Sequence, residues 1–448
     1  MNSYTERVLS RIEAQYAHEK EYLQSVRAWV EMIEPALDDP RFEKLDLLTR
    51  MIEPERIFMF SVPWVDDEGN AHTNHGYRVQ FNSAIGPYKG GMRFHPSVNV
   101  SIVKFLGFEQ TYKNALTGLP IGGAAGGADF DPKGKSKREI MRFCQNFMNA
   151  LYRYIGADTD VPAGDIGVGA REIGYLYGQY KRILGRAESS ALTGKGLTYG
   201  GSKVRQEAAG SGAVYFLERM LDRQGESLSG KRLIVSGFGN MAWGVCKKAT
   251  ELGAVVVTVS GPDGYVYDES GIGTQEKLDY MTQLRAEGGD SIAPFAVRFP
   301  EAKFFAGKKP WEQAGDIAVP CATQNELDVD DAVRIMANDV KYYVEAANMP
   351  ATADALKLLR LSPKIMTAGS KAAGSGGVAV SALEMAQNSI RYNWKRGEVD
   401  KRLRNIMGNI YDASADAAEK YGLGYDLIAG NDIAAFSKIA EAMIAQGV

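Results

Sequence analysis

A glycine-rich turn between a short apolar strand and a helix is the feature that most constrains this chain. The apolar residues 233–235 lead into the run GFGNMA at residues 237–242, and helical spacing follows to residue 252. In such a unit the first glycine makes the turn, the second lets a pyrophosphate approach the backbone, and the helix N-terminus stabilises its charge. The run predicts a dinucleotide-binding βαβ unit. The alternative is a glycine turn that only tightens the corner between strand and helix.

Short β-branched runs alternate with helical segments through the second half of the chain. After the first strand at 231–235, a helix is expected near 276–287 and further strands are expected at 254–259, 316–319, 342–345 and 365–367. Connections of this length indicate parallel βαβ units. The pattern predicts a Rossmann-like, doubly wound domain over residues 201–423.

The first half has a different pattern, typical of a mixed α/β domain. Helical spacing gives way to a β-hairpin, with strands near 57–62 and 75–81 around a polar turn. The glycine-rich segment 119–128 then interrupts two helical segments and is expected to be a loop. Paired glycines at 200–201 mark a boundary, and the last helix can return to the first domain. The N-terminal domain is therefore predicted to comprise residues 1–200 and about 424–448.

Composition excludes several function classes. Fifty-two Lys plus Arg against 55 Asp plus Glu give a net charge of −3, which disfavours nucleic-acid binding. Cys144, Cys246 and Cys321 form no CxxC pair, so neither a disulfide framework nor a thiolate zinc site is expected, and the compartment is expected to be reducing and cytoplasmic. The four histidines lack metal-ligand spacing, so no metal is predicted. Without an apolar signal segment or a run of 18 apolar residues, secretion and membrane spanning are disfavoured.

The segment after the second strand of the coenzyme domain bears on the choice between NAD and NADP. It reads VSGPD over residues 259–263, and no basic residue lies between Ala254 and Asp263. The carboxylate of Asp263 would repel a 2′-phosphate, so NAD is favoured over NADP. Pro262, Asp263 and Gly264 are also explained as a simple turn.

Charged side chains beside glycine-rich segments of the first domain are candidates for substrate binding. Lys89 lies between Pro-Tyr and Gly-Gly, which predicts a turn with room for a ligand carboxylate. Lys104 and Lys113 lie on helical segments, and each of the three lysines alone is also typical of a solvated surface. Asp165, in a glycine loop between helices, either moves a proton or caps the helix that follows.

Longer motifs resemble hexameric NAD(P)-dependent glutamate dehydrogenases of the small bacterial type. The matching runs are YRVQFNSAIGPYKGGMRFHPSVN, KFLGFEQTYKNALTG, DTDVPAGDIGVGAREIGY, GFGNMAWG, PCATQNELDVD and EAANMP, and the resemblance covers essentially the whole chain. It implies an α/β fold with an N-terminal substrate and oligomerisation domain and a Rossmann-like coenzyme domain. It also implies a homohexamer that transfers hydride between NAD(P) and L-glutamate, with 2-oxoglutarate and ammonia as the other reactants.

The resemblance also assigns site residues. Lys89 and Ser381 correspond to the pair that binds the side-chain carboxylate of the substrate. Gln110, Lys113 and the backbone at Gly164 correspond to the site of the α-carboxylate. Coenzyme contacts correspond to Ala209, Gly237, Phe238, Gly239, Asn240, Met241, Pro262, Asp263 and Asn348.

The catalytic position shows the main departure from the resembled family. Asp165 corresponds to the proton-transferring carboxylate, but Ala125 stands where the family has its catalytic lysine. That lysine, its pKa lowered by burial, activates the water that attacks the iminium. Ala209 and Gly374 replace a threonine and an asparagine that contact the nicotinamide end of the site.

Three functions are compatible with these departures. The first is a glutamate dehydrogenase of reduced rate, since loss of a general acid or base costs about 10² to 10⁴ in rate. The second is a dehydrogenase redirected to a bulkier substrate by the shortened side chains. The third is a non-catalytic or regulatory paralogue that binds a dicarboxylate and a nucleotide, acting on an active partner through mixed hexamers.

Overall fold

The computed structural model describes residues 3–286 and 290–447 and divides into two compact units. Unit 1 comprises Met1–Lys203, Val378–Val399 and Asp432–Val448, and unit 2 comprises Val204–Gly377 and Asp400–Asn431. The predicted α/β class with two domains is confirmed. The predicted boundaries placed residues 378–399 in the coenzyme domain, whereas by contacts they belong to unit 1. The reason is that helix α15 (Gly376–Ser389) is hydrogen-bonded to the segment 193–202.

Unit 1 combines helices with one mixed sheet. Its helices are α1 (Ser3–Gln15), α2 (Lys20–Ile33), α3 (Pro40–Lys44), α4 (Leu47–Ile52), α5 (Val100–Leu116), α6 (Lys137–Leu151) and α7 (Ala170–Leu184), with most of α15 and of α17 (Leu427–Ala445). Its strands are β1 (Arg56–Val65), β2 (Ala71–Asn82), β3 (Tyr88–Phe94), β4 (Gly123–Ala128) and β5 (Asp160–Gly164). Short 3₁₀ turns occur at Glu34–Ala36, Tyr152–Tyr154, Ser189–Ala191 and Leu197–Tyr199.

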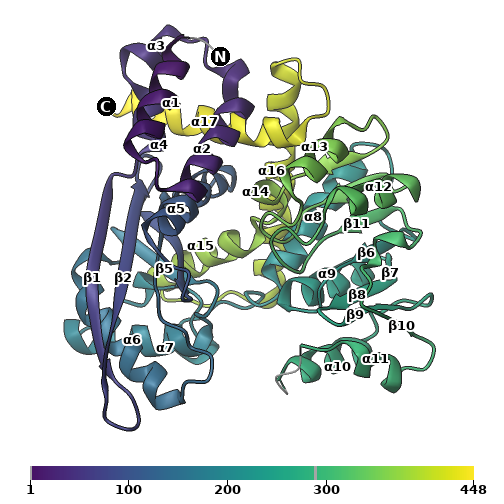
Figure 1. The fold of residues 1–448 in the computed structure, drawn as a ribbon, viewed down its shortest axis with the longest axis horizontal. Helices are drawn as coiled ribbons and strands as arrows, with labels where there is room; N and C mark the ends of the chain where they lie inside the picture. The colour runs from purple at the N-terminus through teal and green to yellow at the C-terminus, as the bar shows by residue number, and fades with distance from the viewer. Residues whose placement is uncertain (1–2, 287–289, 448) are drawn as a thin grey trace. The chain divides into compact units, whose positions relative to one another are not determined.

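The sheet of unit 1 has the strand order β1-β2-β4-β3-β5. The predicted hairpin is confirmed: β1 and β2 pair antiparallel, and they are the two long arrows that run side by side in Figure 1. Strand β4 pairs antiparallel with β2 and parallel with β3, and β3 pairs parallel with β5. The carboxyl ends of β3, β4 and β5 therefore point the same way.

The glycine-rich segment is a strand at the centre of this sheet, so its prediction as a loop is wrong. A Cβ on Gly123 would lie 2.5 Å from Cα of Thr111 on α5, and a Cβ on Gly126 would lie 3.0 Å from Cδ of Arg78. Helix α5 and the Arg78 side chain thus approach opposite faces of β4 more closely than side chains would allow. Small residues in β4 therefore allow neighbours to pack closely against both faces of the strand.

Unit 2 is built on a parallel sheet with the order β13-β12-β11-β6-β7. The strands are β6 (Arg232–Val235), β7 (Val255–Val256), β11 (Ile317–Val319), β12 (Tyr342–Val344) and β13 (Met366–Ala368). The helices are α8 (Ala208–Asp222), α9 (Asn240–Glu251), α10 (Gln275–Ala286), α11 (Ala293–Arg298), α12 (Val329–Ala337), α13 (Ala353–Leu361), α14 (Ser370–Ala373) and most of α16 (Arg396–Lys420), with a 3₁₀ turn at Pro310–Glu312. All four strand pairs are parallel, which confirms the predicted Rossmann-like fold.

A second sheet in unit 2 was not predicted. The single strand expected at 254–259 is divided: β7 stays in the parallel sheet, whereas β8 (Thr258–Gly261) pairs antiparallel with β9 (Gly264–Tyr267), which pairs with β10 (Lys303–Ala306). The turn between β8 and β9 is formed by Pro262 and Asp263. Within the described residues, no helix is long and apolar enough to cross a membrane.

Candidate active site

Lys89 is a buried cation on strand β3. The residue is 1 % exposed, and its Nζ donates a hydrogen bond to Oγ1 of Thr193 at 2.8 Å. This Oγ1 shares a short hydrogen bond with Oγ of Ser381 on α15. The expected turn at Lys89 and the alternative of a solvated lysine are both wrong, because the strand carries the side chain inward. One ammonium and two hydroxyl groups that meet in this way can hold a carboxylate.

Lys113 lies on α5, one helical turn after Gln110. Burial of its ammonium lowers the pKa of Lys113 to about 8, against the opposing effects of the Glu109 and Asp165 carboxylates. The amide of Gln110 donates to Oδ1 of Asn114 at 2.6 Å, and the Asn114 amide donates to the carbonyl oxygen of Lys89 at 2.9 Å. Asn114 therefore ties this part of α5 to the strand that carries Lys89.

Asp165 directly follows Gly164, the last residue of β5. Its carboxylate accepts a hydrogen bond from Nε of Arg93 at 2.9 Å. The alternative that Asp165 caps the next helix is wrong, because α7 begins after Gly169 and is capped through the side chain of Glu172. The carboxylate is instead held over strand β3, within electrostatic reach of Lys113.

Ala125 lies on the same face of the sheet as these groups. Alternation along β4 puts it on the side of Gly123, whose missing Cβ faces Thr111 of α5. The pairing of Met92 with Gly126 places Ala125 beside Gly91, about 4.8 Å away across the strands. A Cβ on Gly91 would lie 2.9 Å from Cβ of Asp165. Ala125 is thus a small, buried neighbour of the Asp165 site, 3 % exposed.

Lys104 belongs to the packing of helices in unit 1. Its Nζ lies 2.5 Å from Oε2 of Glu19 and 3.3 and 4.0 Å from the ring centroids of Tyr16 and Tyr22. This buried pair occupies the contact between α2 and α5. It therefore serves the fold rather than the group around Lys89.

In unit 2 the glycine turn has the geometry that the fingerprint predicts. Gly237 has φ +75, and its N–H donates to Oγ of Ser260 at 2.7 Å. Helix α9 begins after Gly239 and has no side-chain cap, so its first N–H groups remain free of side-chain acceptors. A Cβ on Gly239 would meet open space. Free N–H groups beside an uncrowded backbone fit a pyrophosphate.

The turn lies at the point where the strand order of the parallel sheet reverses. Strand β6 is followed by β7 on one side and by β11 on the other. A Cβ on Gly237 would lie 3.0 Å from the Cys321 carbonyl oxygen and from Cα of Ala322, which follow β11. In doubly wound sheets this crevice is where ligands bind. The Cys321 thiol is buried and donates to the carbonyl oxygen of Val319, and burial raises its pKa well above the usual value, as expected for an inert thiol.

Asp263 stands on the β8–β9 turn, where it meets the start of α11. Burial alone would raise the pKa of Asp263, but hydrogen bonds from Oγ of Ser291 and from the N–H groups of Ile292 and Ala293 outweigh it and lower the pKa. The carboxylate is therefore held ionised. Pro262 is exposed beside it, Phe238 is buried, Met241 is half-buried, and Asn348 is exposed just after β12.

Arg285 brings a positive charge to the glycine turn. Its Nη1 donates to Oδ1 of Asn240, the first residue of α9, at 2.7 Å. Arg285 comes from the end of α10, 45 residues along the chain. This guanidinium lies outside residues 254–263, the segment on which the charge-based prediction of NAD rests.

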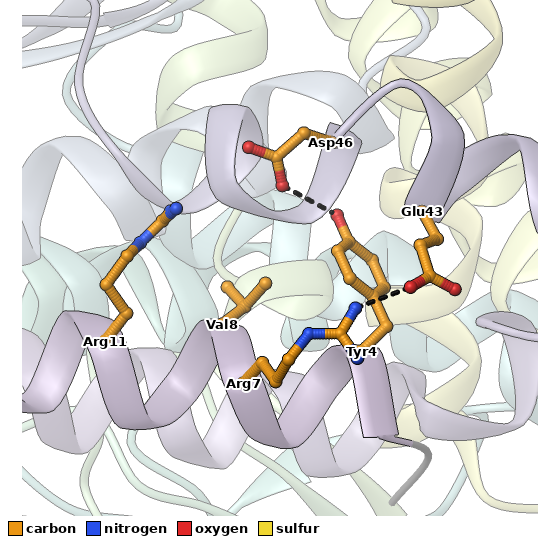
Figure 2. A pocket seen from close by; sticks show the side chains of 6 residues that line it. All are labelled: Tyr4, Arg7, Val8, Arg11, Glu43 and Asp46. Atoms are coloured by element: carbon orange, nitrogen blue, oxygen red, sulfur yellow. Dashed lines mark hydrogen bonds and ion pairs between the residues drawn. The ribbon is translucent and has the colours of Figure 1, made fainter.

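A cavity at the N-terminus of the chain is a different kind of feature. It measures about 360 Å³ and lies between α1 and the segment 43–46. Figure 2 shows the Arg7 guanidinium directed at Glu43 and the Tyr4 hydroxyl directed at Asp46, at 2.5 and 3.2 Å. The opposite charges of its lining compensate one another, so the cavity offers no net charge to a ligand. In the described residues, no group of His, Cys, Asp and Glu is arranged to hold a metal ion.

Comparison with known proteins identifies the family. Residues 54–182 match the Glu/Leu/Phe/Val dehydrogenase dimerisation domain, and residues 200–447 match the Glutamate/Leucine/Phenylalanine/Valine dehydrogenase family. The chain belongs to this family. It is 55% identical to the NAD-specific glutamate dehydrogenase of Clostridium symbiosum over 449 residues, covering 100% of both chains. It is 50% identical to the NADP-specific glutamate dehydrogenase of Escherichia coli strain K12 over 444 residues, covering 99% of this chain and 98% of the relative.

Solved structures agree with this assignment to the Glu/Leu/Phe/Val dehydrogenase family. A glutamate dehydrogenase structure superimposes with a TM-score of 0.98 at 55% identity, covering 100% of both chains. The hetero-hexameric glutamate dehydrogenase of Thermus thermophilus superimposes with a TM-score of 0.82 at 28% identity, covering 95% of this chain and 96% of that chain. The enzyme class of amino-acid dehydrogenase follows from the family.

Two positions that are predicted from the sequence to depart from the family motifs lie on neighbouring segments of unit 2. Ala209 is in the first turn of α8, and Gly374 ends α14. A Cβ on Gly377, three residues after Gly374, would lie 3.7 Å from Cβ of Ala209. Helix α8 also presses on α9, since a Cβ on Gly210 would lie 2.2 Å from the Met241 carbonyl oxygen. The small residues here bring α8 against both the glycine turn and α14.

Sequence reasoning missed three side chains that the fold places beside candidate site residues of this dehydrogenase, Thr193 and Arg93 in unit 1 and Arg285 in unit 2. Thr193 and Arg285 reach these positions through tertiary packing, and nothing in their sequence neighbourhood marks them. Arg93 was within reach of prediction. In a strand, Lys89, Gly91 and Arg93 share one face, so recognising β3 would have placed Arg93 with Lys89.

Proposed function

We propose that this chain is an NAD-linked dehydrogenase of L-glutamate and 2-oxoglutarate whose turnover is limited by Ala125. The observation that carries the proposal is the buried Lys89 with the Thr193 and Ser381 hydroxyls, on the sheet face that is covered by α5, the helix that carries Lys113. Two ammonium groups suit a substrate with two carboxylates. The Clostridium symbiosum relative, named an NAD-specific glutamate dehydrogenase, supports both substrate and coenzyme.

Substrate orientation would come from the two lysines. Lys89 and Ser381 would hold the side-chain carboxylate, with Thr193 between them. Lys113, Gln110 and the backbone N–H of Gly164 would hold the α-carboxylate. Because the two carboxylates are bound at separate points, the carbon between amine and carboxylate is fixed in one orientation. Such fixing is the main contribution a protein makes to a cofactor-dependent reaction.

NAD fits the turn of unit 2, and its nicotinamide supplies the hydride acceptor when bound. Gly237, Gly239 and the first N–H groups of α9 would take the pyrophosphate, because they offer donors without a crowding Cβ. The ionised carboxylate of Asp263 supports NAD rather than NADP. The remaining proposed contacts are Phe238, Asn240, Met241, Pro262, Asn348 and Ala209.

Proton transfer in this proposal depends on Asp165, since Ala125 carries no amine. Asp165 would exchange a proton with the substrate nitrogen, and its ion pair with Arg93 would hold the carboxylate in place. A lysine at position 125 would add a general acid or base beside it. Its loss costs about 10² to 10⁴ in rate.

The test is NADH oxidation with 2-oxoglutarate and ammonium, for the parent chain and for Ala125→Lys. We expect a slow parent and a rate raised about 10²-fold or more by the lysine. Ala125→Met, which is similar in length and lacks the amine, is the matched control and should stay slow. Equal rates for the lysine and methionine variants would contradict the proposal.

A second function, binding without turnover, is favoured by the same buried Ala125 and by the small Ala209 and Gly374. In that case the parent binds glutarate and NADH but oxidises no NADH, and the protein acts on an active partner in mixed hexamers. Isothermal titration of glutarate, beside a panel of bulkier 2-oxo acids in the rate assay, distinguishes this function from a redirected enzyme. Turnover of a bulkier oxo acid at a higher rate than 2-oxoglutarate would support redirection.

A homohexamer is part of the proposal. Strand β1 is at the edge of its sheet, and its outward positions Ile57, Met59 and Val65 are exposed, Met59 by 62 %. A long edge strand with an apolar outer face suits association with a second copy. The match of residues 54–182 to a dimerisation domain supports this surface. The three buried free cysteines support a reducing, cytoplasmic location.

A further inference from the structure

The segment Leu192–Lys195 is attached to α15 through one buried carboxylate. Glu384 accepts hydrogen bonds from the N–H of Gly194 at 3.0 Å and from the N–H of Lys195 at 3.3 Å. The Lys195 ammonium lies 2.7 Å from Oε1 of Glu384, and both side chains are fully buried. The same ammonium donates to the carbonyl oxygen of Leu192. The backbone on both sides of Thr193 is therefore fixed by one ion pair.

Thr193 itself is fixed on a third side. Its N–H donates to the carbonyl oxygen of Pro162 on β5 at 3.0 Å. Glu384 and the Lys195 ammonium fix the backbone on either side of Thr193. The Thr193 hydroxyl therefore lies between Nζ of Lys89 and Oγ of Ser381 and is hydrogen-bonded to both. A buried hydroxyl in such a position orients both of its partners.

Helix α15 carries both ends of this arrangement. Ser381 and Glu384 are three residues apart and so lie on one helix face, one above the other. Further along, the Gln387 amide donates to Oγ of Ser202 at 2.8 Å and the Asn388 amide to the carbonyl oxygen of Gly200 at 2.7 Å. The face of α15 that presents Ser381 thus holds the segment that presents Thr193.

We infer that the Lys195–Glu384 pair is a positioning device that sets the selectivity of the Lys89 site for a ligand with a distal carboxylate. The inference rests on the proposed function, in which Lys89, Thr193 and Ser381 bind that carboxylate. Neither Lys195 nor Glu384 needs to touch the ligand. A shift of the 192–195 backbone would move the Thr193 hydroxyl away from Lys89 and lower selectivity, while α-carboxylate binding at Lys113 would persist.

Two neutral double variants separate the backbone hydrogen bonds from the charge. In the parent, Oε2 of Glu384 accepts from the N–H of residue 194 and Oε1 accepts from the N–H of residue 195. In Lys195→Met/Glu384→Gln the amide oxygen still accepts from one of these N–H groups, and in Lys195→Met/Glu384→Leu neither has a side-chain acceptor. Replacing a buried ion pair by neutral groups is often tolerated, whereas breaking it from one side is not. Glu384→Asp, which keeps the charge and withdraws it by one methylene, is a further variant for the case in which the leucine variant does not fold.

The measurement is the ratio of affinities for 2-oxoglutarate and 2-oxovalerate, which differ at the distal carboxylate, by isothermal titration of the full chain. We expect the leucine variant, or Glu384→Asp, to lower this ratio about tenfold, and the glutamine variant to stay within about threefold of the parent. NADH affinity and oligomer size should not change. The matched control is Lys104→Met/Glu19→Gln, a buried pair that does not touch the 192–195 segment.

The outcomes separate the inference from the proposal on which it rests. An unchanged ratio in every folded Glu384 variant, together with loss of selectivity in Lys89→Met, overturns the positioning role alone. An equal fall in both affinities, or the same fall in the Lys104 control, indicates general damage and also overturns it. Retained selectivity in Lys89→Met would overturn the proposed site itself.

Discussion

Lys113 gives the candidate substrate site a pH dependence that follows from its surroundings. Burial lowers the pKa of Lys113 from 10.5 to about 8. At about 1.4 kcal/mol per pKa unit, keeping this ammonium charged in the fold costs about 3 kcal/mol relative to water. A ligand carboxylate beside the ammonium would offset part of this cost. Dicarboxylate binding should therefore be strongest where Lys113 is charged.

The magnitude follows from the charged fraction. With a pKa of about 8, this fraction falls from about nine-tenths at pH 7 to about one-tenth at pH 9. Only the charged form attracts a carboxylate, so the Kd of glutarate should rise about tenfold between these values. Binding at pH 8.5 should also take up a proton, because the bound carboxylate raises the pKa of Lys113.

The stability of the free protein should move in the opposite direction. The folded pKa of Lys113 lies below the unfolded value of 10.5, so the unfolded state binds more protons between about pH 8 and 10.5. The free energy of unfolding contributed by Lys113 therefore rises with pH across this window, by up to about 3 kcal/mol. Weaker binding at high pH would thus not result from a loosened fold.

Isothermal titration with glutarate from pH 6.5 to 9.5, at constant ionic strength and in two buffers of different ionisation heat, measures both affinity and proton uptake. Lys113→Met is the control, since it removes the titrating group and keeps the length of the side chain. A Kd that stays constant from pH 7 to 9, or a slope that survives in Lys113→Met, would refute the reasoning.

Three further perturbations follow from single contacts. Arg285→Met should weaken NADH and NADPH binding by a similar factor of about tenfold, measured by fluorescence titration, because the guanidinium at Asn240 lies at the start of α9, where the pyrophosphate common to both coenzymes is proposed to bind; a loss for NADPH alone would contradict this reason. Met59→Lys should dissociate the assembly, seen by light scattering as a shift below six times the chain mass of 48.9 kDa, whereas the same change at the exposed Val297 should not. Gly90→Ala should destabilise the fold by more than about 3 kcal/mol in urea unfolding, because its Cβ would lie 1.5 Å from the Ala124 carbonyl oxygen; near-parental stability would show that β3 and β4 can separate.

The parallel sheet of unit 2 was predictable because its signals are local. Each strand is a short β-branched run next to a helix with its own periodicity, and Gly237 marks the turn by a backbone conformation that other residues avoid. Strand β8 was not predicted as a separate strand, because residues 254–259 were predicted to form one continuous strand. Nothing in the sequence shows where a strand leaves one sheet for another, because its pairing with β9 and β10 is tertiary.

The strand β4 was missed for the opposite reason. Its sequence, GAAGGA, carries no β-branched or aromatic residue, and intrinsic preference therefore argues for a loop. The fold needs a strand there that leaves room for α5 on one face and for Arg78 on the other. Because α5 and Arg78 pack so closely against β4, only small residues fit in this strand. The sequence of β4 alone does not show this requirement, since it depends on the tertiary positions of α5 and Arg78.

The candidate site was predictable where a residue acts through its own strand or helix. Lys89, Lys113 and Asp165 were named as candidates from their own segments, although the environments of Lys89 and Asp165 were not predicted: Lys89 was expected on a turn, and Asp165 was weighed as a helix cap. Thr193 and Glu384 were not predicted because the partners of each lie nearly two hundred residues away in the chain: Thr193 bonds Ser381 on α15, and Glu384 on α15 bonds Gly194. Residues that come together only through long-range packing have no characteristic spacing in the sequence, so no motif predicts them.

The surroundings of Ala125 leave one direction for a longer side chain, along the sheet toward Asp165, although α5 crowds the same face of β4 at Gly123. Position 125 is flanked across the sheet by Val79 on β2 and by the glycine at position 91 on β3. A Cβ at position 91 would approach Cβ of Asp165 to 2.9 Å, so glycine keeps the path from position 125 to the carboxylate clear. A lysine of about 6 Å reach could then cross one strand spacing of about 4.8 Å. Ala125→Met, which has a similar length and no charge to bury, should therefore fold with parental stability, and a fall of several degrees in its unfolding temperature would show that this path is closed.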